Sequence, residues 1–104
     1  MRFPKTVRIG ALRYKVYSLR TLPAPYVKNA GLIRFKDRAI FVTSHSYTGS
    51  RWTAKQRRIL FWHEVVHGIL HDMKRYKLNN DERFVHGFAT RLEGAAAIRR
   101  GRGK

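Results

Sequence analysis

The chain has 104 residues and no cysteine, which allows one domain with a modest core and excludes disulfide bonds and thiolate metal ligands. Apolar residues make up 43% and aromatic residues 12%, too many for a disordered protein, and no apolar run reaches the roughly 20 residues of a membrane helix. The 23 Lys and Arg residues outnumber the 6 Asp and Glu residues, and the net charge of +17 predicts attraction to polyanions such as nucleic acid.

Four strands are predicted in the first half of the chain. Residues Lys5–Ile9 and Leu12–Leu19 are joined by a two-residue turn, and the second segment alternates apolar and basic residues, as a strand with one buried face does. After a proline-containing loop, the short apolar segments Leu32–Phe35 and Ala39–Thr43 predict a hairpin. We expect Ala39–Thr43 to form the exposed edge of the sheet, where an extended peptide can add as a further strand.

A long helix is predicted to follow, from Thr53 to about Lys74. Thr53 and Gln56 have the spacing of a capping box, in which each side chain satisfies a backbone N–H group of the first helical turn. Apolar residues then surround most of the helix circumference. A helix of this kind is buried, so its histidines are expected in the interior or in a cleft.

A second helix is predicted to begin at Asn79, with Asn79 as the N-cap and Glu82 three residues later. The last residues, 99–104, are rich in arginine and glycine and carry no apolar anchor, which predicts a basic flexible tail. Residues 1–98 are therefore expected to form a single domain.

The long helix carries His63, Glu64 and His67 in the pattern His-Glu-x-x-His. Histidines four residues apart on a helix point the same way, so both imidazoles can reach one metal ion. The intervening Glu64 lies about 100° around the helix, close enough to activate a metal-bound water without being a ligand. With cysteine absent, this spacing predicts a zinc site with Glu64 as the general base.

A catalytic zinc requires a third protein ligand, for which the sequence leaves several candidates open. Glu82 is the first choice, although a glutamate in the first turn also stabilises a helix without any metal. Asp81 is a neighbouring alternative, and His71 lies on the correct face but about 12 Å along the axis from the first histidine of the motif. Of the other histidines, His86 is predicted on the solvated far side of the second helix. His45 lies in a loop that could reach the cleft, but no feature of the sequence places it at the site.

Several segments resemble small phage and prophage zinc metallopeptidases. They are the Pro-Lys-Thr-Val-Arg-Ile-Gly start, the Tyr-Lys-Val strand, His-Glu-Val-Val-His-Gly-Ile-Leu-His, and Asp-Glu-Arg-Phe-Val. Those proteins are similar to the minimal zincin cores of the ImmA/IrrE and SprT-like families. The resemblance covers Pro4 to about Leu92 and implies an α+β fold, with a small antiparallel sheet of three to four strands packed on two helices. It also implies His63, His67 and Glu82 as zinc ligands. SprT-like members carry a third histidine in place of that glutamate, so a glutamate-type zincin is the better match.

Two functions from different classes follow from these observations. The first is a zinc metallopeptidase that hydrolyses peptide bonds of a protein substrate, in a setting near nucleic acid that the basic surface would suit. The alternative is a basic nucleic-acid-binding or adaptor protein with a structural or vestigial zinc site. The start of the chain shows no signal-peptide pattern, which predicts a cytoplasmic location, that of the host cell if the chain is phage-encoded.

Overall fold

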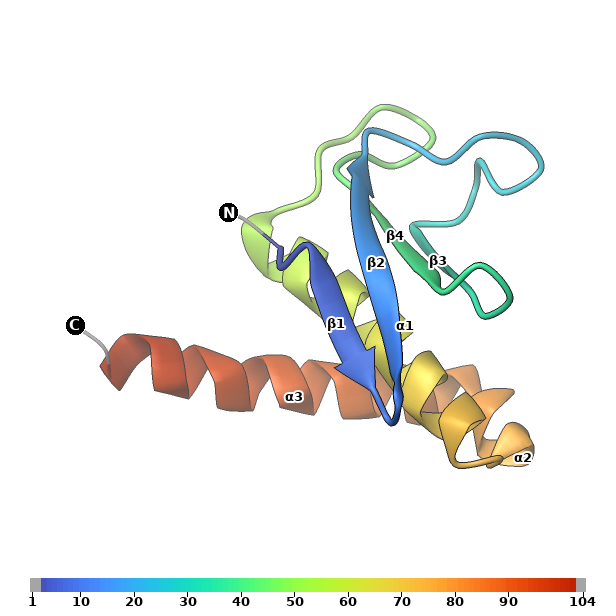
Figure 1. Cartoon of the computed structure of the whole chain (residues 1–104). Helices are drawn as coiled ribbons and strands as arrows, with labels where there is room; N and C mark the ends of the chain where they lie inside the picture. Colours follow the sequence, from blue (N-terminus) through green and yellow to red (C-terminus); the bar gives the residue numbers. More distant parts are fainter. Residues whose placement is uncertain (1–2, 103–104) are drawn as a thin grey trace.

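The computed structural model describes the backbone of residues 3–102 and the side chains of residues 3–96. It confirms an α+β fold with a sheet packed on helices (Figure 1). The elements in chain order are β1 (Thr6–Ile9), β2 (Leu12–Leu19), β3 (Gly31–Arg34), β4 (Ala39–Thr43), α1 (Ala54–Asp72), α2 (Tyr76–Asn79) and α3 (Glu82–Arg102).

The four strands form one sheet in the order β1-β2-β4-β3. The β1–β2 and β3–β4 pairs are antiparallel hairpins, as predicted, but β2 and β4 run parallel, so the sheet is mixed rather than wholly antiparallel. This arrangement arises because the chain after β2 bypasses one strand position, so that β4 rather than β3 pairs with β2. The prediction that Ala39–Thr43 is the edge was therefore wrong, and β3 is the edge strand at that side.

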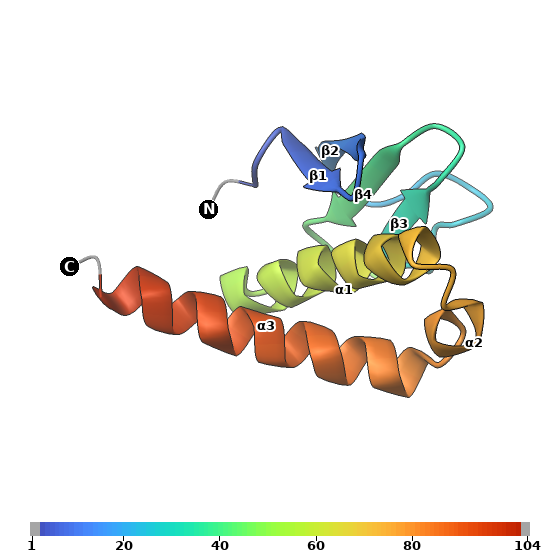
Figure 2. The same cartoon turned by 60° about the horizontal axis from the view of Figure 1, so that its bottom comes forward.

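Helix α1 lies between the sheet and α3, which makes three layers (Figure 2). One apolar cluster fills the space between the sheet and α1, and a second fills the space between α1 and α3. The buried residues are Ile9, Tyr14, Ile40, Val42, Phe61 and Val65 in the first, and Val66, Leu70 and Val85 in the second. Burial on both sides explains why α1 is apolar around most of its circumference. Within residues 3–102, no helix has the length and apolarity needed to cross a membrane.

Helix α1 begins with the predicted capping box. The Thr53 hydroxyl accepts from the Gln56 backbone N–H at 3.1 Å, and the Gln56 side chain accepts from the Thr53 N–H at 2.8 Å. Farther along, α1 approaches the sheet closely at Gly68, where an added Cβ atom would lie 2.5 Å from the Ile9 Cδ1 atom. The glycine that follows the second histidine of the motif therefore sets how near the motif lies to the strands.

The connection from α1 to α3 differs from the prediction. The short helix α2 lies mostly between the two predicted helices, where no element was predicted. The N-cap of α3 is Asp81, whose carboxylate accepts from the Phe84 N–H at 3.1 Å. Asn79 is therefore not the N-cap, and Glu82 is the first residue of α3 rather than the third. The predicted tail over 99–104 begins inside α3, whose backbone helix extends to Arg102; residues 103–104 lie outside the described residues.

Candidate metal centre

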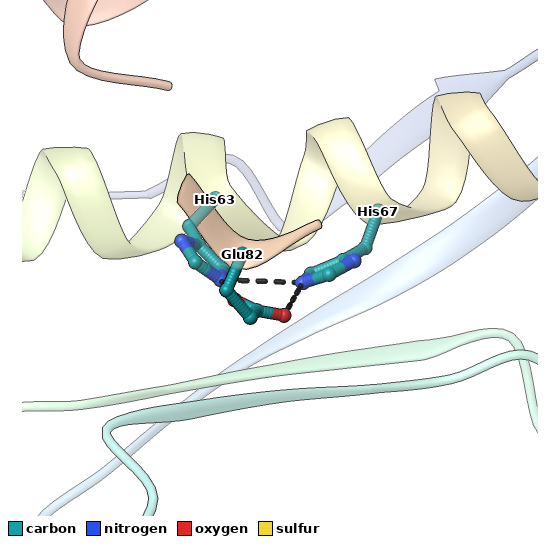
Figure 3. A group of neighbouring side chains, drawn as sticks. All are labelled: His63, His67 and Glu82. Carbon is teal, nitrogen blue, oxygen red and sulfur yellow. Dashed lines mark hydrogen bonds and ion pairs between the residues drawn. The ribbon is translucent and has the colours of Figure 1, made fainter. Parts of the chain in front are cut away.

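Three of the predicted ligands meet at one point between α1 and α3 (Figure 3). The Nε2 atoms of His63 and His67 lie 3.2 Å apart. The Glu82 carboxylate spans them, with Oε2 at 2.9 Å from Nε2 of His63 and Oε1 at 3.0 Å from Nε2 of His67. Two of the candidate ligands come from adjacent turns of α1 and the third from the first turn of α3, so the cluster depends on the packing of these two helices.

The donor set suits a zinc ion. Ligand atoms around a tetrahedral zinc, at 2.0–2.2 Å from the metal, lie about 3.3–3.6 Å from one another, a few tenths of an ångström more than the separations of 2.9–3.2 Å found here. Two imidazole nitrogens and a carboxylate this close all direct lone pairs toward the same point, which is unfavourable unless a proton or a cation lies between them. Three protein ligands also leave one position of a tetrahedral ion open to water or substrate.

The protonation of the histidines also suits metal binding. Nδ1 of His67 forms a hydrogen bond with Oδ1 of Asn79. Because an amide oxygen can only accept, Nδ1 carries the proton, and the Nε2 lone pair of His67 is directed at the cluster. Burial lowers the pKa of His63, and the neighbouring His67 lowers it further, while Glu82 opposes both. A lowered pKa favours the neutral imidazole, the form that binds metal.

Glu64 lies beside this cluster but is not part of it. Its side chain belongs to a residue that is only 6% exposed, and burial, with a smaller contribution from the charge of Glu82, raises its pKa to about 8. A carboxyl group with a pKa near neutral can both accept and release a proton at physiological pH. The predicted general base therefore has the environment that this role requires.

The backbone of the edge strand β3 lies directly against Glu64. A Cβ atom added at Gly31 would be 2.9 Å from Glu64 Oε2 and 3.2 Å from the Phe41 carbonyl oxygen, so only glycine fits without displacing a neighbour. Sequence reasoning did not identify Gly31. The one available signal was a glycine immediately before the predicted strand Leu32–Phe35, because glycine in a strand often marks a close backbone approach.

The metal-ligand cluster and Glu64 line one cleft of about 610 Å³. Strand β3 forms one wall, α1 the floor, and the region from Asn79 to His86 the opposite wall. The main lining residues are His63, Glu64, His67 and Glu82 with Gly31, Ile33, Phe35, Leu60, Asn79 and His86. The cleft thus combines a polar end, at the three candidate ligands and Glu64, with an apolar surface, as small ligand and peptide sites commonly do.

The remaining candidates have other surroundings. His71 stacks on Phe35, with ring centroids 3.8 Å apart, and lies outside the ligand cluster. Asp81 caps α3. His45 is hydrogen-bonded in its loop to Ser44 at 2.7 Å and to Arg20 at 3.4 Å.

His86 was expected to be solvated and on the far side of the second helix; it is exposed, as predicted, but its position on the far side was wrong. Its side chain is exposed but lines the cleft, with its ring centroid 6.0 Å from that of His63. It lies one turn after Glu82 on α3, so the face of α3 that carries Glu82 also carries His86. The spacing of four residues was the signal that could have identified it.

Comparison with known proteins finds no matching protein-family model, no matching curated protein and no matching solved structure.

Proposed function

We propose that the protein is a zinc-dependent peptidase in which Glu64 is the general base and His63, His67 and Glu82 hold the metal. The observation that carries this proposal is the buried Glu64 carboxyl group, which lies in the same cleft as a three-ligand cluster. A site that only stabilised the fold would have no use for a proton acceptor there, and such sites commonly use four protein ligands.

Each residue has a distinct task in the proposed reaction. His63 and His67 present their Nε2 lone pairs, and Asn79 fixes the orientation of the His67 ring. A zinc ion, when bound, would acidify a water molecule and polarise the carbonyl of the peptide bond. The Glu64 carboxylate takes a proton from the attacking water and transfers it to the nitrogen of the leaving amine.

The edge strand β3 supplies the means to orient a peptide. The outer side of β3 in the sheet has no strand neighbour among residues 3–102, so its main-chain groups can pair with an extended peptide. Gly31 at the start of β3 lies against Glu64, which brings a peptide paired there close to the base. The substrate class that fits is an extended or unfolded segment of a protein.

The alternative function is nucleic-acid binding or an adaptor role with a structural or vestigial zinc site. It predicts salt-sensitive binding to nucleic acid that survives Glu64→Gln, and no cleavage of any peptide. The two functions therefore differ in whether the zinc-loaded protein cleaves peptides and whether Glu64→Gln abolishes that cleavage.

The decisive experiment measures zinc content and peptide cleavage on the same protein samples. Purified protein is loaded with zinc, its metal content is determined by elemental analysis, and cleavage of a broad peptide library is followed by mass spectrometry. We expect about one zinc per chain. The Glu64→Gln variant should keep the metal and lose cleavage, whereas His63→Ala and Glu82→Ala should lose both.

The matched control is His45→Ala, which removes a histidine hydrogen-bonded within a loop outside the cleft. It should retain both zinc and cleavage. The proposal fails if the zinc-loaded protein cleaves nothing in the library, or if Glu64→Gln cleaves as fast as the unchanged protein.

A further inference from the structure

The outer face of the sheet points away from α1 and carries basic and aromatic side chains. Both long helices lie on the other side of the sheet (Figure 2). Because side chains alternate along a strand, the residues on either side of the inward-facing Ile9, Tyr14, Val16, Ile33, Ile40 and Val42 point to this outer face. Those that are at least partly exposed include Arg8 on β1, Arg13, Lys15, Tyr17 and Leu19 on β2, Phe41 on β4, and Leu32 and Arg34 on β3.

The strand register arranges these residues in rows. Tyr17, Phe41 and Leu32 are opposite one another across β2, β4 and β3, and the Tyr17 and Phe41 rings stack at 5.2 Å between centroids. The adjacent row places Lys15 and Arg34 on either side of the small Ala39. An aromatic row therefore lies next to a basic row.

A hollow of about 350 Å³ lies beside the aromatic row. The loop from Leu22 to Tyr26 closes it on one side, and Phe41, Leu32 and Arg34 belong to its lining on the sheet. The hollow thus combines an aromatic floor with a cation, and it is large enough for a planar ring.

The charge of this part of the chain is almost entirely positive. Residues 5–43 contain nine Lys and Arg residues, namely Lys5, Arg8, Arg13, Lys15, Arg20, Lys28, Arg34, Lys36 and Arg38, and a single acidic residue, Asp37. Asp37 pairs with Arg34 at 2.8 Å, but both side chains are about half exposed, so Arg34 remains accessible. An occupant of this face should therefore be an anion.

We propose that the outer face of the sheet binds single-stranded nucleic acid, with bases stacked on the Tyr17–Phe41 row and phosphates along the Lys15–Arg34 row. Single-strand binding combines aromatic stacking with a basic track, and both lie here in adjacent rows. A duplex presents only its phosphates to such a surface and leaves the aromatic row unused. The face is on the opposite side of the sheet from α1, so this proposal does not depend on the metal centre.

The test is fluorescence anisotropy with a labelled oligothymidine and a labelled duplex of the same length, at low and moderate salt. We expect tighter binding of the single strand. Tyr17→Ala should weaken it by about 5- to 150-fold, which corresponds to about 1–3 kcal/mol for one stacked base. Tyr17→Phe, which keeps the ring, should retain the affinity. Lys15→Ala should weaken binding and lower its dependence on salt.

Two controls remove comparable side chains from the helices. Phe88→Ala removes an exposed aromatic residue from α3, and Lys77→Ala removes an exposed cation from α2. Both should leave the preference for the single strand unchanged. Circular dichroism of Tyr17→Ala establishes that a loss of binding is not a loss of folding.

Three outcomes would overturn the proposal. The first is a folded Tyr17→Ala protein that binds the single strand as well as the unchanged protein. The second is equal binding of duplex and single strand with the same salt dependence, which indicates a basic surface without stacking. The third is an acidic peptide that displaces the single strand at equal charge concentration and binds equally well to Tyr17→Ala.

Discussion

Replacing Glu64 by Gln should stabilise the metal-free protein, and increasingly so as the pH rises. The Glu64 side chain belongs to a residue that is 6% exposed, and its pKa is raised from 4.5 to about 8, chiefly by burial. The folded protein therefore holds the proton more tightly than the unfolded chain does. Glutamine keeps the size and shape of the side chain without a group that must be protonated or left charged in the interior.

The size of the effect follows from the two pKa values. A group whose pKa is raised on folding stabilises the folded protein fully at pH values below its pKa in the unfolded chain. This contribution is lost as the pH rises through its pKa in the folded protein. At pH 7, which is about 2.5 pH units above the unfolded pKa of 4.5, the folded state of the unchanged protein is destabilised by about 3 kcal/mol relative to low pH. At pH 5 the same reasoning gives only about 1 kcal/mol.

The assay is urea unfolding in the presence of a chelator, with both proteins at pH 5, 6 and 7. The difference in unfolding free energy should increase by about 1 kcal/mol for each pH unit. Asp37→Asn is the matched control, because it also removes one negative charge but from an exposed ion pair with Arg34. A difference that stays constant between pH 5 and pH 7, or a variant that is less stable throughout, would refute the reasoning.

Three further predictions concern the residues around the site. Asn79→Ala should weaken zinc binding by about 10- to 100-fold in a chelator competition, because the His67 ring loses its hydrogen-bond acceptor, whereas the exposed Asn80→Ala should not. Gly31→Ala should keep zinc but lower kcat/KM for peptide cleavage by about 100-fold, since the added Cβ displaces the buried Glu64 carboxylate. Gly94→Ala is its control, because a Cβ atom added at Gly94 would have no described residue outside its own helix within 4 Å. Thr53→Ala should lower the unfolding free energy by about 1 kcal/mol in a denaturant titration, and no change there would contradict the capping role.

Local patterns in the sequence were sufficient to predict much of the fold. The capping box at Thr53 and the two hairpins depend on residues close together in the chain, and each was predicted from spacing and side-chain type. The same holds for His63 and His67, because the geometry of one helix brings residues four positions apart to the same face. These features required no knowledge of how the elements pack.

Features that join distant segments could not be deduced in this way. The parallel pairing of β2 with β4 and the position of β3 at the edge depend on which strand the crossover places innermost, and either order keeps the same alternation of residues. Asn79 and Asp81 both suit an N-cap, but in the structure Asp81 caps α3 and the Asn79 side chain accepts a hydrogen bond from His67 on α1.

The sequence by itself therefore determined the helix that carries the His-Glu-x-x-His motif, because a periodic pattern along one helix is a local property. Only the tertiary structure decided that Glu82 reaches the two histidines, that Gly31 lies against Glu64, and that His86 borders the cleft. Each of these contacts joins side chains or backbone from different elements. Their distances are set by how α1 packs on the sheet and on α3, which no spacing along the chain specifies.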